Sequence, residues 1–146
     1  MWLRWASGVV APLAAAVLLL APGPVGSNER CIVAPFQNAL APGGTQATMR
    51  VVNDSGPCRI VNYVDTRARL QPDAIRTVVR PQYGSVKISQ PGTIYYRPSP
   101  GFVGTDEFTY AGTGRTRDGR LVEMNVRVFV TVVPPPALQA EADKTP

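Results

Sequence analysis

Apolar and polar residues alternate over thirteen positions between Leu121 and Val133, and few folds can accommodate such a segment. One face of the segment carries Val122, Met124, Val126, Val128, Val130 and Val132. The other face is mostly polar, with Glu123, Asn125, Arg127 and Thr131. Successive side chains of a β-strand point to opposite faces, so this period of two predicts a long strand that is buried on one side. Phe129 interrupts the polar face, which predicts that part of this face is covered as well.

Shorter segments with the same alternation precede this strand, and clusters of Gly, Pro and Asn separate them. We expect strands over residues 46–52, 58–64, 74–80, 84–88, 93–97 and 107–111, with a polar loop at 113–120. No window after residue 27 has the pattern of an amphipathic helix. The sequence therefore predicts an all-β fold, an antiparallel β-sandwich of about seven strands.

Residues 1–27 have the pattern of a secretory signal peptide. Arg4 is followed by the uncharged stretch from Trp5 to Ala21, and small residues precede a cleavage site after Ser27. A cut after Ala21 is less favourable, because it leaves Pro22 at the new N-terminus. The other alternative is an uncleaved anchor, although an apolar stretch of about 17 residues lies at the lower limit for crossing a bilayer. Both alternatives export the rest of the chain, so we expect a periplasmic or extracellular protein.

Removal of residues 1–27 from the 146-residue chain leaves 119 residues and no further transmembrane span. We expect these to form one domain at 28–133 and a Pro-rich tail at 134–146. Three consecutive prolines at 134–136 cannot continue a sheet, and the remaining residues have little to bury, which predicts a disordered tail.

The chain has two cysteines, Cys31 and Cys58. In an exported chain an even pair predicts a disulfide, and closing a loop of this length stabilises a fold by about 3–4 kcal/mol. A redox-active pair is the alternative, but its usual signature places only two residues between the cysteines. We therefore expect a structural disulfide that ties the N-terminal segment to the domain.

The absence of histidine excludes much catalytic and metal chemistry. The chain cannot supply a His general base, a Ser-His-Asp or Cys-His arrangement, or a His-ligated zinc. The adjacent carboxylates Asp106 and Glu107 would point to opposite faces of a strand. Ser85 and Lys87 share a strand face that we expect to meet solvent. We therefore predict a protein that is not an enzyme, with no catalytic residues, cofactor or metal.

A specific motif covers residues 81–132. It includes Gly84-Ser-Val86, then Tyr96-Arg-Pro98, then Gly101-Phe102-Val-Gly104-Thr-Asp106-Glu-Phe108-Thr-Tyr110, and it ends in the valine-rich strand. This stretch resembles the bacterial immunoglobulin-like/cadherin-like repeat, here as a single exported domain. The resemblance implies that the predicted sandwich is an antiparallel immunoglobulin-like/cadherin-like β-sandwich and that the protein is bacterial. The family consists of extracellular or periplasmic proteins, and its fold is usually repeated in tandem in adhesins.

The motif residues have structural explanations. The rings of Tyr96, Phe102, Phe108 and Tyr110 can fill a small core. Gly101 and Gly104 permit a tight loop around Phe102, and the Asp106 carboxylate can accept N–H bonds from that loop. Members of the resembled family often carry an acidic segment suited to calcium. Here Arg67 and Arg69 stand in the corresponding region between Asp65 and Asp73, so we expect no calcium site.

The formal net charge is +5, and it becomes +4 once Arg4 leaves with the signal peptide. Arg115, Arg117 and Arg120 gather in one loop, and Arg67 and Arg69 lie in another. The functional interpretation is an anion-binding surface, and the alternative is a solvated surface with an arginine-rich composition. Nucleic acid is not an expected partner, because the chain has an export signal and no nucleic-acid motif.

These observations predict a non-catalytic module of the cell envelope that supports protein interaction, adhesion or structure. One alternative is an accessory or inhibitory subunit of an envelope complex. Another is a binder of anionic envelope polysaccharide through the Arg115–Arg120 loop. The sequence does not identify the partner or the oligomeric state.

Overall fold

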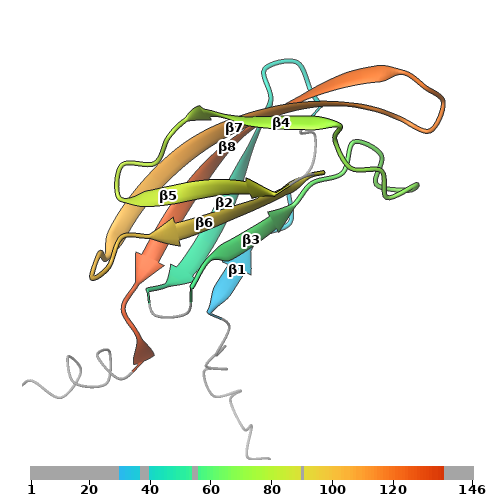
Figure 1. Ribbon diagram of the computed structural model, residues 1–146. Coiled ribbons are helices and arrows are strands. Elements are labelled where there is room, and N and C mark those ends of the chain that lie inside the picture. Colours follow the sequence, from blue (N-terminus) through green and yellow to red (C-terminus); the bar gives the residue numbers. More distant parts are fainter. Residues whose placement is uncertain (1–29, 37–39, 54–55, 90, 137–146) are drawn as a thin grey trace, which may run out of the picture.

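The chain forms two β-sheets that pack against each other (Figure 1). The computed structural model describes residues 30–36, 40–53, 56–89 and 91–136. Within these ranges it forms eight strands, which are β1 (Cys31–Val33), β2 (Thr45–Val52), β3 (Cys58–Val61), β4 (Ala74–Val79), β5 (Gly84–Ser89), β6 (Thr93–Pro98), β7 (Gly104–Arg115) and β8 (Leu121–Val133).

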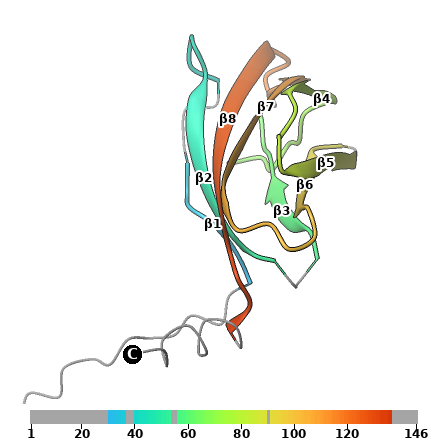
Figure 2. The ribbon, with the colours of Figure 1, turned by 90° about the vertical axis from the view of Figure 1, so that its left-hand side faces the viewer.

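The strands form a five-stranded sheet in the order β1-β2-β8-β7-β4 and a three-stranded sheet in the order β3-β6-β5. Figure 2 views the sheets from the side, where β2 and β8 form one layer and β3, β5 and β6 form the other. The predicted all-β sandwich is therefore confirmed.

The core lies between the layers and follows the predicted alternation. Met124, Val126, Val128, Val130 and Val132 of β8 are all buried, as predicted for one face of this strand. Other strands add side chains to the same cluster, including Ala47, Met49, Val51, Ile60, Ile94, Tyr96, Phe108 and Tyr110. Phe129, on the opposite face of β8, is half-buried, with the Arg127 guanidinium 5.0 Å from its ring centroid.

The strand β7 is longer than predicted, because it pairs with β8 from Gly104 to Arg115 and shortens the expected loop to residues 116–120. Gly112 and Gly114 lie buried in this strand, and small residues weaken the alternation signal. The strand β1 was not predicted, since three residues are too few to show a period. The predicted strand at 58–64 ends at Val61, because the Asn62 N–H donates to Gly92 O outside the ladder.

One strand pair is parallel, whereas the sequence predicted an antiparallel sandwich. The strands β2 and β8 pair in parallel from Thr45 with Val126 to Val52 with Val133, and the other pairs are antiparallel. Alternation is the same for both strand directions, so it reports which face is buried and carries no information about the partner's direction.

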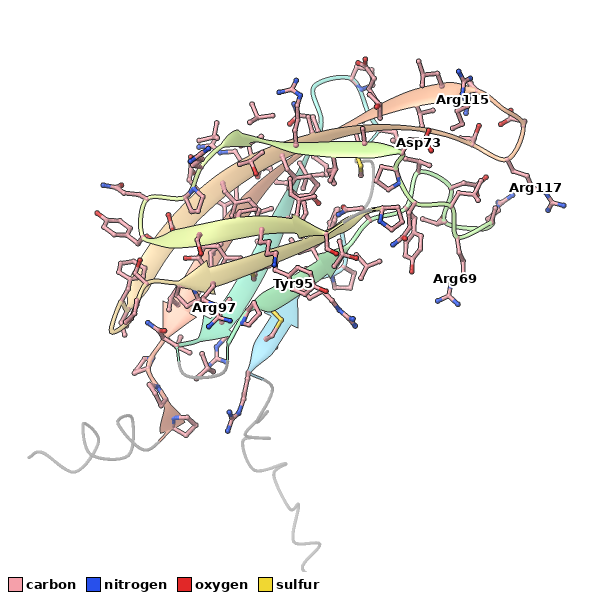
Figure 3. The ribbon with its side chains drawn as sticks, viewed as in Figure 1. Arg69, Asp73, Tyr95, Arg97, Arg115 and Arg117 are labelled. Atoms are coloured by element: carbon pink, nitrogen blue, oxygen red, sulfur yellow. A yellow bond between two sulfur atoms is a disulfide. The ribbon has the colours of Figure 1, made fainter. Side chains whose placement is uncertain are left out.

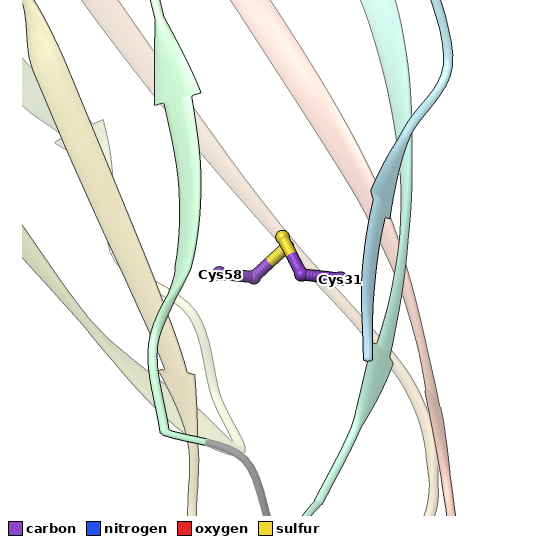
Figure 4. Close-up of a disulfide and its surroundings, with 2 residues drawn as sticks. All are labelled: Cys31 and Cys58. Carbon is purple, nitrogen blue, oxygen red and sulfur yellow. A yellow bond between two sulfur atoms is a disulfide. The ribbon is translucent and has the colours of Figure 1, made fainter. Parts of the chain in front are cut away.

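The predicted disulfide between Cys31 and Cys58 is confirmed, with a Cα–Cα distance of 5.2 Å (Figure 4). Cys31 begins β1 at one edge of the five-stranded sheet, and Cys58 begins β3 at one edge of the three-stranded sheet. The bond therefore joins the two layers of the sandwich.

Two predicted segments lie outside the described residues. The signal peptide at 1–27 falls entirely within the range 1–29, and most of the predicted tail falls within 137–146. At the start of the tail, β8 ends at Val133, directly before the three prolines.

Candidate functional site

Asp106 holds the motif residues together from a buried position on β7. Its carboxylate accepts hydrogen bonds from the backbone N–H groups of Gln82 (2.9 Å) and Tyr83 (3.0 Å). It also accepts the Tyr96 hydroxyl (2.8 Å) and the N–H of Glu107 (2.9 Å). We predicted donors from the loop around Phe102, and this was wrong. Three of these four donors lie before β5 and on β6, because alternation turns the Asp106 side chain inward to face the opposite sheet, and the fourth is the neighbouring N–H on β7.

The Tyr96 hydroxyl completes this network in the interior. Tyr96 is fully buried, and this burial, together with its hydrogen bond to the Asp106 carboxylate and the nearby negative charge, raises the pKa of its phenol. A proton held this firmly is not available for acid–base exchange at neutral pH. The network therefore links three segments of the fold and leaves no carboxylate oxygen without a donor.

The motif aromatics divide between core and loop. Tyr96 and Phe108 stack with ring centroids 5.6 Å apart, and Phe108 lies 6.3 Å from the Tyr110 ring. Phe102 is only half-buried and stacks on the exposed Tyr83 ring, with centroids 4.5 Å apart. The prediction that Phe102 fills the core is therefore wrong in part, because the ring covers the edge of the core next to the loop.

The motif glycines and proline have steric roles. A Cβ on Gly84 would lie 2.6 Å from the Tyr96 ring, and Gly84 pairs in register with the buried Pro98. Gly104 has a φ of 144°, in the region that favours glycine, and lies beside the Phe102 ring. These contacts explain the motif without a ligand.

Glu107 points to the other face of β7, as predicted for adjacent strand residues. Its carboxylate forms an ion pair with the Arg127 guanidinium of β8, at 2.8 Å. Asp106 and Glu107 therefore do not share a site, and the arrangement does not form an acid–base pair.

The predicted anion-binding arginines lie at the tip of the β7–β8 hairpin. Figure 3 places Arg115 and Arg117 there, with Arg69 on the neighbouring turn. The Arg115 guanidinium donates to Gly119 O at 2.9 Å, so it closes its own loop. The Arg117 N–H donates to Asp65 at 3.3 Å, and Asp118 lies between Arg117 and Arg120 in the same loop. The structure brings the three arginines to one end of the molecule, but with acids among them.

Hydrogen bonds stabilise both acids of this tip in the charged form. The N–H of Ala68 is the main cause that lowers the pKa of Asp65, and the N–H of Arg117 adds to it. The hydrogen bond from the Thr116 hydroxyl is the main cause that lowers the pKa of Asp118, and the charge of Arg120 lowers it further. The acids remain ionised at neutral pH and offset part of the positive charge.

Within the described ranges, no group of three or more Cys, Asp or Glu residues could hold a metal ion. In the segment where the resembled family is often acidic, Asp65 caps a turn by accepting the Ala68 N–H at 2.9 Å, and Asp65 pairs with Leu70. This carboxylate therefore has a local structural partner.

A second buried polar contact was missed by the sequence reasoning. Asn62 is only 2 % exposed, accepts the Tyr110 hydroxyl at 2.6 Å and donates to Gly92 O at 3.1 Å. Burial raises the pKa of the Tyr110 phenol. The signal was present, because Asn62 continues the inward phase of Cys58 and Ile60. Like Asp106, Asn62 connects the two sheets through a tyrosine hydroxyl.

Ser85 and Lys87 lie on the exposed face of β5, as predicted. They border a shallow cavity of about 460 Å³ together with Pro57, Ser89, Tyr95 and Arg97. Ser85, Lys87 and Arg97 are exposed on this outer face, and within the described part of the chain no ion pair involves them.

Together, the two sheets, the inter-sheet disulfide and the buried polar contacts define an immunoglobulin-like β-sandwich, a class that is generally not enzymatic. Residues 34–128 match the bacterial Ig domain family, so the chain belongs to this family. The bacterial Ig-like part of the predicted resemblance is thereby confirmed. A search of curated proteins found no match. Within the described residues, no helix is long and apolar enough to cross a membrane.

Proposed function

We propose that this chain is an exported, non-catalytic Ig-like module that acts in molecular recognition at the bacterial cell envelope. The observation that carries the proposal is the Cys31–Cys58 disulfide, which joins the two sheets of a bacterial Ig domain. Disulfides persist in oxidising compartments such as the periplasm and the cell exterior. The signal-like pattern of residues 1–27 supports the same compartment.

The contacts of the candidate reactive groups support a role in recognition. The Asp106 carboxylate is fully hydrogen-bonded in the interior, and Glu107 is paired with Arg127. The chain has no histidine. What remains for function is the surface of the sandwich.

Cell fractionation and intact mass test the export proposal. The full chain, expressed in a bacterium, should be recovered from the periplasm or medium with the mass of residues 28–146. Its cysteines should react with an alkylating agent only after reduction. Recovery in the cytoplasm at full length with two reactive thiols would contradict export.

Cross-linking in the native envelope, followed by identification of the captured molecules, tests the recognition proposal. Capture of one protein in fixed stoichiometry would favour an accessory subunit. Hydrolysis of ester, peptide or glycoside substrates by the pure domain would contradict the non-catalytic role.

A further inference from the structure

The outer face of the three-stranded sheet carries a regular array of cations around a tyrosine. Arg59 of β3 and Lys87 of β5 both lie opposite Tyr95 of the central strand β6. Arg97, two residues along β6 on the same face, lies opposite Ser85. These four side chains, with Ser85, Ser89 and Thr93, are hereafter called the β6 face.

The β6 face is turned to solvent. Arg59, Lys87, Arg97 and both serines are exposed, while the inward residues Cys58, Ile94 and Tyr96 are fully buried. Neighbouring strands lie about 4.8 Å apart, which places the Cα atoms of Arg59 and Lys87 roughly 10 Å apart on either side of Tyr95. Figure 3 shows Tyr95 and Arg97 on the front sheet, away from the hairpin tip.

The charge of this face is of one sign. The strands β3, β5 and β6 contain no Asp or Glu. Among the described residues, no carboxylate forms an ion pair with Arg59, Lys87 or Arg97. The other sheet differs, because its outer face mixes signs and pairs Arg127 with Glu107. The two faces of the sandwich are therefore electrostatically unequal.

We propose that the β6 face binds a carboxylated polysaccharide, a polymer of uronic-acid type. This proposal rests on the proposed function and names the partner of the recognition module. Arg59, Lys87 and Arg97 bind carboxylates of successive sugar units, the arginines by paired N–H···O bonds. The half-buried Tyr95 ring packs on a sugar ring between them, above the cavity of about 460 Å³.

The composition of the face favours a polysaccharide over an acidic protein. Protein interfaces have an apolar centre with large anchor side chains. In the three strands of this sheet, Tyr95 is the only outward-facing ring and Val61, opposite Thr93, is the only outward-facing aliphatic side chain. Hydroxyl groups of Ser85, Ser89 and Thr93 make up much of the remaining face. Hydroxyls and cations suit a polar, hydroxylated ligand, whose groups all need hydrogen-bond partners.

The β6 face is a better anion site than the arginine-rich tip. At the tip, Asp65 and Asp118 lie among the cations and Arg115 already binds Gly119 O. The strands of the β6 face contain no acid, so no neighbouring carboxylate in these strands offsets the charge of the three cations.

Binding of the full exported chain to immobilised alginate, a soluble polymer of uronic acids, tests the proposal. Dextran serves as the uncharged polysaccharide and polyglutamate as the polyanion without sugar. We expect binding to alginate that weakens with salt, no binding to dextran, and weaker binding to polyglutamate. The triple variant Arg59→Gln, Lys87→Gln, Arg97→Gln should lose about tenfold or more in affinity.

The matched control is Arg115→Gln, Arg117→Gln, Arg120→Gln, which removes the same charge from the tip and should change alginate affinity less than about threefold. Tyr95→Ala should weaken alginate binding, whereas Tyr95→Phe, which keeps the ring, should bind alginate as the parent protein does. Thermal melting establishes that each variant is folded. No alginate binding, equal binding to polyglutamate, or loss of binding in the tip variant would each overturn the proposal. Export is measured separately, so a failure here is distinct from a failure of the proposed function.

Discussion

At the scale of single residues, two buried polar side chains hold the sheets together through tyrosine hydroxyls. The Asp106 carboxylate accepts hydrogen bonds from the Tyr96 hydroxyl and from two backbone N–H groups of the segment before β5. The Asn62 side-chain oxygen accepts a hydrogen bond from the Tyr110 hydroxyl. Because buried donors left without a partner cost more than a made bond gains, these contacts also select one packing of the sheets.

Asp106→Ala should therefore destabilise the fold strongly. The change leaves the Tyr96 hydroxyl and the N–H groups of Gln82 and Tyr83 without their acceptor. We expect a loss of about 2–4 kcal/mol in the free energy of unfolding, measured by urea denaturation. Glu107→Ala is the matched control, because its exposed ion pair is worth at most about 1 kcal/mol. Equal losses for both variants would refute the role given to Asp106.

Gly84→Ala tests the close approach of β5 to the Tyr96 ring. The added methyl group would lie 2.6 Å from a ring carbon and 2.7 Å from Arg97 O, so the strand must shift. We expect a loss of about 1–3 kcal/mol in urea denaturation. Ser85→Ala, one residue along on the exposed face, should stay within about 0.5 kcal/mol. A Gly84→Ala protein as stable as the parent would contradict this account.

At the scale of elements, the short strand β1 depends on its covalent link. It pairs with β2 over only three residues, from Cys31 with Val51 to Val33 with Met49. A strand this short contributes little by itself. The disulfide to β3 holds it at the edge of the sheet, so the two features form one unit.

Replacing both cysteines by alanine should loosen the pairing of β1 with β2, because the covalent link of β1 to β3 is lost. We expect a loss of about 3–4 kcal/mol of stability from the chain-entropy effect. The amide of Ile32, which lies opposite Arg50 at a hydrogen-bonded position of the β1–β2 ladder, should exchange with solvent much faster. Amides in the centre of β8 should show the smallest decrease in protection. Hydrogen exchange on the oxidised and reduced parent protein provides the control. Unchanged protection in β1 after reduction would show that its pairing does not need the bond.

At the scale of the whole molecule, the buried tyrosines make stability depend on alkaline pH. Burial first, then hydrogen bonding to Asp106, raises the pKa of Tyr96 above its ordinary value of 10.0. Burial does the same for Tyr110. In the unfolded chain both phenols lose their protons near the ordinary value, so the unfolded state is favoured as pH rises above it.

The free energy of unfolding should therefore be independent of these two groups below pH 9 and fall above about pH 10. Each tyrosine contributes a slope of up to about 1.4 kcal/mol per pH unit. Urea denaturation across this range measures the slope of the free energy of unfolding against pH. Tyr110→Phe should reduce this slope by the contribution of one tyrosine. A slope that is the same in the variant and the parent would contradict the raised pKa of Tyr110.

The charge distribution is also a property of the whole molecule. The net charge of the chain is modest, but the strands of the three-stranded sheet hold cations without acids, while the tip and the other sheet mix both signs. Screening at physiological ionic strength limits such effects to about 8 Å, so local arrangement decides binding more than the total charge does. This is why we assign recognition to the β6 face.

The all-β class, the buried face of β8, the disulfide and the resemblance to a bacterial Ig domain could be predicted from the sequence. These features depend on local periodicity and on residue types, both of which can be read from the sequence. The parallel pairing of β2 with β8, the donors to Asp106 and the array around Tyr95 became visible in the three-dimensional structure. Each of these brings together residues far apart in the sequence, and alternation specifies which face a side chain takes but not which strand lies beside it.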